Sequence, residues 1–136
     1  MTALTQDRNT LRRNGDQMEP PVAAATRIFA GSMVAINTGG YAVPGATSTT
    51  LKAAGVAEHR ADNSAGAAGD IRVRVRKGVH QLGNSASTDA IALADIGADC
   101  YMVDDQTVAK TSGTSTRSVA GKVFDVDADG VWVKFI

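Results

Sequence analysis

Apolar and polar residues alternate along much of the chain from residue 25 to the C-terminus. The clearest segment is 71–76, Ile-Arg-Val-Arg-Val-Arg, in which every second side chain is apolar. In a strand, alternate side chains point to opposite faces, so this segment is predicted to have one buried and one exposed face. No segment has the period of an amphipathic helix. The pattern therefore predicts an all-β protein.

Short strands are predicted along the rest of this region, and glycine-containing turns separate several of them. Asp-Gly between two alternating segments predicts a hairpin whose turn is residues 127–130. Residues 61–69, which are mostly small, are predicted to form a loop. Many short antiparallel strands joined by such turns favour a compact β-sandwich or small β-barrel. The remaining predicted strands are 26–29, 33–36, 41–43, 55–60, 79–82, 90–93, 100–103, 107–110, 119–126 and 131–135.

Two parts of the chain resemble each other at a spacing of 66 residues. Gly31 and Gly97 each open a predicted hairpin, and the Ala-Gly pairs at 54–55 and 120–121 follow at the same spacing. One interpretation is an internal duplication, with two similar β-layers wrapped around one core. The other is that any two glycine-flanked hairpins look alike.

Residues 1–24 differ from the rest because they are mostly polar and show no strand or helix pattern. The pair Pro20-Pro21 forces an extended backbone near the end of this segment. We predict an extended N-terminal arm over 1–24 and a β-domain over 25–136. The arm is interpreted as a partner-binding segment, and the alternative is a flexible tail. Its candidate contact residues are Arg8, Arg12, Arg13, Pro20 and Pro21.

The composition excludes several classes of protein. Fourteen basic and fourteen acidic residues give a net charge of zero, without the basic excess of a free nucleic-acid binder. No apolar run approaches the roughly 18–20 residues that span a bilayer, and no signal-peptide core begins the chain. Synthesis in a cytoplasm is expected. The chain has only six aromatic residues, which predicts a thin core, so burial between subunits would help to stabilise it.

The candidate chemical sites are few. Asp125, Asp127 and Asp129 before a glycine match the start of a calcium loop, but an EF-hand is excluded because loop position 12 is Ile136. A looser calcium site or a simple Asp-rich turn remain as interpretations.

No other pattern predicts a reactive or metal-binding site. His59 and His80 lack zinc-ligand spacing, and Cys100 is read as a small buried residue. The chain has no phosphate-binding loop and no nucleophile elbow. We expect neither an enzyme nor a bound cofactor.

Arg72, Arg74 and Arg76 form a basic row on one face of the predicted strand 71–76. One interpretation is nucleic-acid binding, but no aromatic residues interleave with the row. A second is a solvated strand face. Another is a seam between subunits, in which the row pairs with acidic residues of a neighbouring copy. The acidic residues considered are Asp89, Asp95, Asp99, Asp104 and Asp105.

From residue 25 onward the order and spacing of several segments resemble the capsid decoration proteins of tailed bacteriophages, also called cement or minor capsid proteins. The segments are 27–36 (RIFAGSMVAI), 40–44 (GYAVP), 55–58 (GVAE), 65–74 (AGAAGDIRVR), 77–79 (KGV), 101–109 (YMVDDQTVA) and 130–133 (GVWV). No single segment is diagnostic, and the arm lies outside the resemblance.

The resemblance implies a structural virion protein on the outer capsid surface, made in the bacterial host cytoplasm. It implies that the major capsid protein is the partner and that the protein self-associates, as a homotrimer at local threefold positions. The shell would be stabilised by bridging capsid subunits, without nucleic acid or membrane as partners. The alternatives are another head or tail subunit, such as a fibre base or connector, or a host- or glycan-binding β-module.

Overall fold

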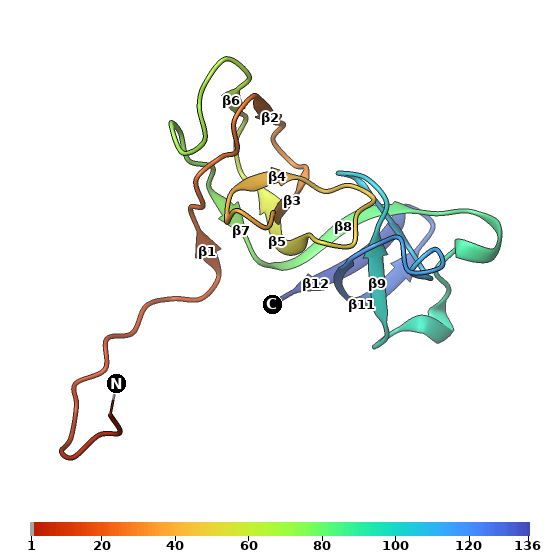
Figure 1. Ribbon diagram of the computed structural model, residues 1–136. Coiled ribbons are helices and arrows are strands. Elements are labelled where there is room, and N and C mark those ends of the chain that lie inside the picture. Colours follow the sequence, from red (N-terminus) through yellow and green to blue (C-terminus); the bar gives the residue numbers. More distant parts are fainter. Residues whose placement is uncertain (1) are drawn as a thin grey trace.

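The computed structural model describes residues 2–136, and apart from two short 3₁₀ turns its regular structure is β (Figure 1). The all-β prediction is confirmed. The strands are β1 (Gln17–Met18), β2 (Thr26–Ile28), β3 (Met33–Ile36), β4 (Ala42–Pro44), β5 (Lys52–Ala57), β6 (Ala61–Asn63), β7 (Val75–Arg76), β8 (Gly78–Asn84), β9 (Asp99–Met102), β10 (Thr107–Ala109), β11 (Val119–Asp127) and β12 (Gly130–Phe135), with the 3₁₀ turns η1 (Ser87–Asp89) and η2 (Leu93–Asp95) between β8 and β9.

The C-terminal half is a small closed barrel with the strand order β10-β8-β12-β11-β9. The predicted turn at residues 127–130 joins β11 and β12, which pair from Lys122–Lys134 to Asp127–Gly130. Every pairing is antiparallel except that of β8 with β10, which is parallel. The prediction of a small barrel is therefore confirmed. The prediction that its strands are all antiparallel is wrong for β8 and β10.

The N-terminal half contains a five-stranded sheet in the order β1-β7-β5-β3-β4. The chain that leaves β1 returns to the other edge of this sheet, where Val22 forms a parallel bridge with Ala42 of β4. This bridge closes the sheet into a ring. The pair β2–β6 projects from the ring and is seen at the top of Figure 1. Residues 61–63 therefore belong to a strand, where the sequence predicted only a loop.

The two halves have the same strand pairing. In β3 and β5, Val34 pairs with Gly55, and 66 residues later Cys100 of β9 pairs with Gly121 of β11. Both pairings skip one alanine, at 54 and at 120. The bridge of Val22 to Ala42 has its counterpart in the pair Asn84–Val108, also parallel. Since pairings and irregularities recur at matching positions, the fold supports the interpretation of an internal duplication.

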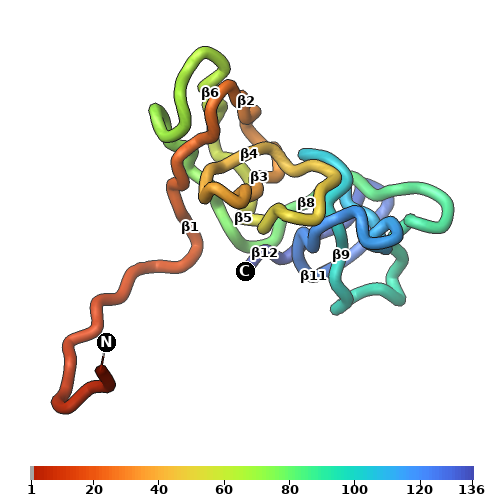
Figure 2. Tube along the Cα trace, in the orientation of Figure 1, coloured from red at the N-terminus to blue at the C-terminus, as the bar shows by residue number. Residues whose placement is uncertain are grey.

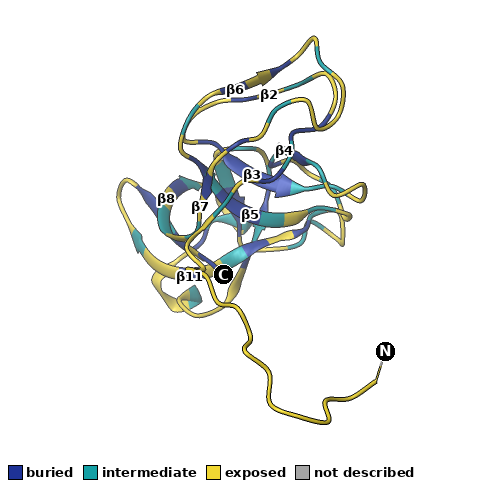
Figure 3. Ribbon diagram, turned by 90° about the vertical axis from the view of Figure 1, so that its left-hand side faces the viewer, coloured by how far each residue is buried: buried dark blue, intermediate teal, exposed yellow. Residues whose placement is uncertain are grey.

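Each half has its own core, which corrects the expectation of one core between two layers. The first core contains Val34 and Val75, and the second contains Cys100 and Val133 at the matching positions. All four are fully buried. Closing each sheet on itself puts the inward face of every strand inside its own ring, so the two sets of side chains do not merge. Figure 3 shows the buried residues along the strands of the body.

The halves are joined along the outer face of β3. Met33 and Ala35 of β3 are buried with the core of the C-terminal barrel. The Met33 amide donates a 2.7 Å hydrogen bond to the carbonyl oxygen of Asp105, in the turn after β9. Ser118 links the halves again, because its hydroxyl donates to the Ser48 carbonyl at 2.6 Å. The two rings are therefore packed against each other.

Lys77 contacts three parts of the chain: the residue before β1, strand β5 and the last residue. The Lys77 amide donates to the Asp16 carbonyl at 2.8 Å, and its ammonium group donates to an oxygen of Ile136 at 2.6 Å. The ammonium also donates to the Ala54 carbonyl at 3.0 Å. A single residue, through its backbone amide and its side chain, thus connects three distant parts of the sequence.

The projecting arm is shorter than the 1–24 predicted from the sequence. β1 pairs with β7, and Pro20 and Val22 are buried. These contacts make residues 17–24 part of the first ring, since they take the place that β8 takes in the second. We define the arm as residues 2–16, which extend away from the body in Figures 1 and 3. Polarity alone did not mark this boundary.

Candidate interaction surfaces

The arm is exposed along its whole length and runs away from the body before its N-terminal part turns back (Figure 2). Leu4 is 72% exposed and Leu11 is 89% exposed. Within residues 2–136, Arg8, Arg12 and Arg13 make no ion pair. The arginines are well solvated, but burial of the two leucines in an intermolecular contact would be favourable.

Pro20 and Pro21, which were candidates for partner contacts, serve the first ring instead. Pro20 is buried, and its carbonyl accepts a 3.2 Å hydrogen bond from the Val73 amide. The Pro21 carbonyl accepts from the Ala42 amide at 2.7 Å. Proline lacks an amide hydrogen, and here both residues act only as acceptors. They close the ring and are not part of the projecting arm.

The basic row Arg72, Arg74 and Arg76 is exposed, as the alternation predicts, but it is paired within the chain. Arg76 Nε lies 2.5 Å from Glu58 Oε1, and Arg74 Nε lies 3.5 Å from Glu19 Oε1. The Arg76 hydrogen bond lowers the pKa of Glu58, and Glu58 in turn raises the pKa of Arg76.

Arg72 has a partner of another kind, because it donates to the Glu19 carbonyl at 2.6 Å. The arginine row therefore holds the segment around β1 against β7 and β5. This local role accounts for the row within one chain, and a seam between subunits stays a prediction.

The acidic residues proposed for the other side of that seam are mostly paired as well. Asp89 lies 3.3 Å from Arg117, Asp95 3.8 Å from Lys110, and Asp99 2.6 Å from Lys122. A hydrogen bond from the Thr111 hydroxyl, followed by Arg117, lowers the pKa of Asp89. Asp104 and Asp105 differ, because among the described residues neither takes part in an ion pair.

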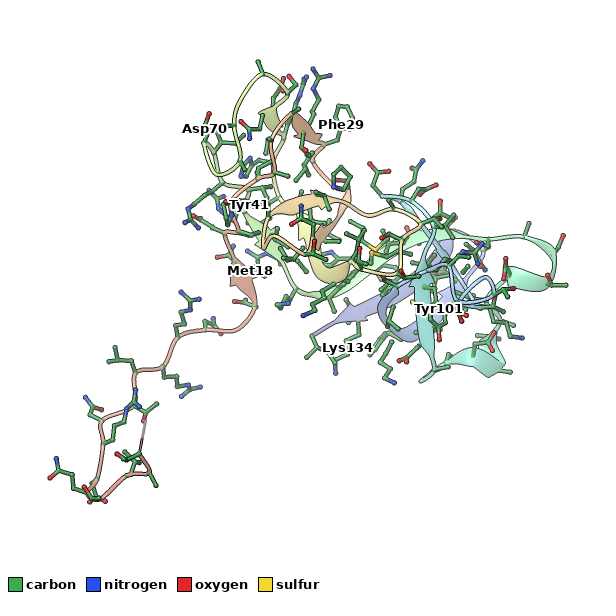
Figure 4. All side chains as sticks on the ribbon, viewed as in Figure 1. Met18, Phe29, Tyr41, Asp70, Tyr101 and Lys134 are labelled. Carbon is green, nitrogen blue, oxygen red and sulfur yellow. The ribbon has the colours of Figure 1, made fainter. Side chains whose placement is uncertain are left out.

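A pocket of about 340 Å³ lies beside Asp105, where a turn of each half meets the other. Its lining consists of the segment from Phe29 to Ser32, between β2 and β3, with Asp105 and Gln106 from the turn between β9 and β10. The Phe29 ring is 53% exposed at the end of β2 (Figure 4), and the Arg60 guanidinium lies 5.8 Å from its centroid. The pocket thus combines an exposed aromatic ring with a carboxylate.

This pocket was not predicted from the sequence. One signal was present: Ile28 and Phe29 are consecutive apolar residues at a strand end, and alternation can bury only one of them. Ile28 is buried, so Phe29 points outward. The approach of residues 105–106 depends on how the halves pack, which no local pattern reveals.

The Asp-rich turn is stabilised by its own hydrogen bonds. Asp127 accepts from the Trp132 indole nitrogen at 2.8 Å and from the amides of Asp129 and Gly130. The Trp132 bond is the main cause of the lowered pKa of Asp127. Among residues 2–136, no group of three metal-ligating side chains is found. The geometry favours the interpretation of a hairpin turn.

Both histidines and the cysteine are engaged in the structure. His59 Nε2 accepts from the Arg74 amide at 3.0 Å, and its Nδ1 lies 3.0 Å from the Arg60 carbonyl. His80 lies against Phe135 and contacts the carbonyls of residues 76 and 77. Cys100 is buried, as predicted, and burial raises the pKa of its thiol to about 11.

Compared with known proteins, the chain matches no family model, no curated protein and no solved structure. Among the described residues, no helix is long and apolar enough to cross a membrane.

Proposed function

We propose that this protein is a structural virion subunit that binds the outer surface of a bacteriophage capsid and stabilises the shell by bridging major capsid subunits as a homotrimer. One structural observation carries the proposal: an exposed arm, residues 2–16, projects from a compact and duplicated β-body. The resemblance of residues 25–136 to capsid decoration proteins gives this architecture its context.

The proposed mechanism is mechanical. A body that sits on one capsid subunit and an arm that reaches a neighbour make two linked contacts, and the second forms at the high local concentration set by the first. Fifteen extended residues span at most roughly 50 Å, which is enough to cross a subunit joint. Many such weak links raise the force or temperature at which the shell opens.

The arm has the composition for such contacts. Leu4 and Leu11 offer apolar surface, and the three arginines offer charge that the body leaves unpaired. Its backbone, which forms no strand before β1, is also suited to adding a strand to an exposed sheet edge. The body then acts as the anchor and the arm as the connector.

A stoichiometry count on purified particles tests the proposal. Quantitative mass spectrometry should find copies in the order of one per major capsid subunit. Mild treatment should release the protein while the shells stay closed. A few copies per particle would instead indicate a tail or connector subunit, and absence from particles would refute a virion role.

A reconstitution experiment tests the division of labour. Shells stripped of this protein are incubated with the full chain or with a chain that lacks residues 2–13. The full chain should raise the shell melting temperature. The shortened chain should bind less tightly and stabilise less, although its body is intact. Equal stabilisation by both chains would show that the arm has no part in bridging.

A further inference from the structure

The arm carries a short segment whose chemistry matches the Phe29 pocket. Leu11, Arg12 and Arg13 follow one another in an extended, exposed stretch. In an extended chain, residues two apart point to the same side, so Leu11 and Arg13 share a face and Arg12 points away. This face presents one apolar group and one cation, about 6–7 Å apart along the backbone.

The pocket presents the complementary pair. The exposed Phe29 ring provides apolar surface at one side, and Asp105 provides a carboxylate that no cation of the described chain neutralises. Asp104 adds a second negative charge next to it. The volume of about 340 Å³ is within the range of sites that hold a small ligand or a side chain.

The pocket and the arm of one chain lie at opposite ends of the molecule. In Figures 1 and 3 the arm leaves the body on the side away from β2 and β6, while Phe29 follows β2. The base of the arm is fixed by the pairing of β1 with β7 and by the bond from Lys77 to Asp16. An arm from another copy has no such restriction.

We infer that the arm of one copy docks in the Phe29 pocket of a second copy, with Leu11 against the Phe29 ring and Arg13 paired with Asp105. The contact is heterologous, since the arm and the pocket are different surfaces, and such contacts close into rings when the rotation permits. The inference shares with the proposed function the self-association of the chain, and it specifies the surfaces involved. It does not depend on capsid binding.

Sedimentation velocity of the full chain over a range of concentrations tests the docking. Wild-type protein should associate reversibly, and more weakly at high salt because charges are screened. Arg13→Asp should weaken the association about 100-fold or more, since like charges would face each other. Arg12→Asp is the matched control: it makes the same change in charge on the opposite side of the arm and should have a much smaller effect.

The same comparison is made on the pocket. Asp105→Arg should weaken association, whereas Asp129→Arg, on an acidic turn that does not line the pocket, should not. Phe29→Ala should also weaken association, because it removes the ring against which Leu11 packs. A mixture of Arg13→Asp with Asp105→Arg should regain association, because the reversed charges match only between different copies. Failure of this mixture to associate would overturn the inference.

Cross-linking provides a second readout. Leu11→Cys in one preparation and Gln106→Cys in another should form a disulfide-linked heterodimer after mixing and mild oxidation. Cys100 does not interfere because it is buried. A wild-type chain that stays monomeric at all concentrations, or equal effects of Arg12→Asp and Arg13→Asp, would refute the docking.

Failure of this inference and failure of the proposed function are separable. If the arm and the pocket associate in solution but particles carry no copies of the protein, the proposed capsid function is refuted and the docking is not. Abundant copies on particles, from a wild-type chain that stays monomeric in solution at all concentrations, would refute the docking alone.

Discussion

Gly55 and Gly121 lie at the same position in the two halves, and at each a Cβ atom would be 2.4 Å from a carbonyl oxygen of the adjacent strand, Arg76 or Lys134. A real Cβ does not approach so closely, so both strands require glycine for the same reason. The repeated Ala-Gly pair is therefore a consequence of one packing arrangement that occurs twice.

Alanine at either glycine should destabilise the protein. The backbone oxygen leaves no room for relaxation by rotamer change, and we expect a cost of about 1–3 kcal/mol at Gly121. The cost at Gly55 should be larger, because its φ of +147° is also unfavourable for alanine. Urea unfolding measures both effects. Gly15→Ala, in the arm with nothing within 4 Å, is the control and should leave the midpoint unchanged.

Met33→Ala should destabilise both halves together. The side chain is fully buried and belongs to β3 of the first half, yet it packs with the core of the second. Loss of a large buried side chain typically costs about 2–5 kcal/mol. Hydrogen exchange followed by mass spectrometry should show faster exchange in β5 and in β11. Faster exchange confined to β3–β5 would contradict the coupling.

Asp127→Ala should loosen the turn between β11 and β12. The carboxylate accepts three hydrogen bonds, and its lowered pKa means that it stabilises the fold above its unfolded pKa. This stabilisation is lost as the pH falls through the folded pKa, so the wild-type melting temperature should decline below about pH 4 more than that of the variant. Trp132, the only tryptophan, reports the change by its fluorescence. Asp129→Ala is the matched control.

Cys100 should react slowly with thiol reagents in the native state. Burial favours the neutral thiol and raises its pKa to about 11, so little thiolate exists at pH 8. An unfolded thiol ionises at about 8.5, so the preference of the fold for the neutral form begins to destabilise it above that pH. Reaction with a chromogenic disulfide should be fast only in denaturant. Fast native labelling would indicate that the barrel opens.

Glu58→Gln should free the base of the arm while leaving the body folded. Glu58 contacts Arg74, Arg76 and Gln17, and exposed ion pairs of this kind contribute little to global stability. We expect faster hydrogen exchange over residues 16–19 and an almost unchanged unfolding midpoint. Asp62→Asn, which removes the carboxylate paired with Arg27 near β2, should leave exchange at residues 16–19 unchanged.

Local sequence patterns were sufficient for much of the fold. The predicted segments 33–36, 79–82, 119–126 and 131–135 coincide with β3, β8, β11 and β12, and Asp-Gly predicts the last hairpin, since these signals act between neighbours in sequence. The segment 71–76, which alternates most strictly, forms a regular strand only at Val75 and Arg76. The spacing of 66 residues also indicated the duplication. In contrast, β1 and β6 are two and three residues long and exist because distant strands pair with them.

The interaction surfaces were predicted less well. Charge alternation identified the row from Arg72 to Arg76, but its partners Glu19 and Glu58 are distant in sequence, so the pairing could not be read from the row itself. The exposure of the arm arginines could be predicted, because the arm is a polar segment. The Phe29 pocket requires the approach of Asp105 from the other half, which depends on the packing of β3.

The meeting of three chain segments at Lys77 has a consequence for how the polypeptide can be reconnected. Asp16 and Ile136 both contact this one residue, so the ends of the folded body are separated by little more than the length of a lysine. A short linker from 136 to 16, with new termini opened in an exposed loop such as residues 114–116 between β10 and β11, would give a circular permutant that keeps both rings. A protein fused after Ile136 would lie beside the base of the arm.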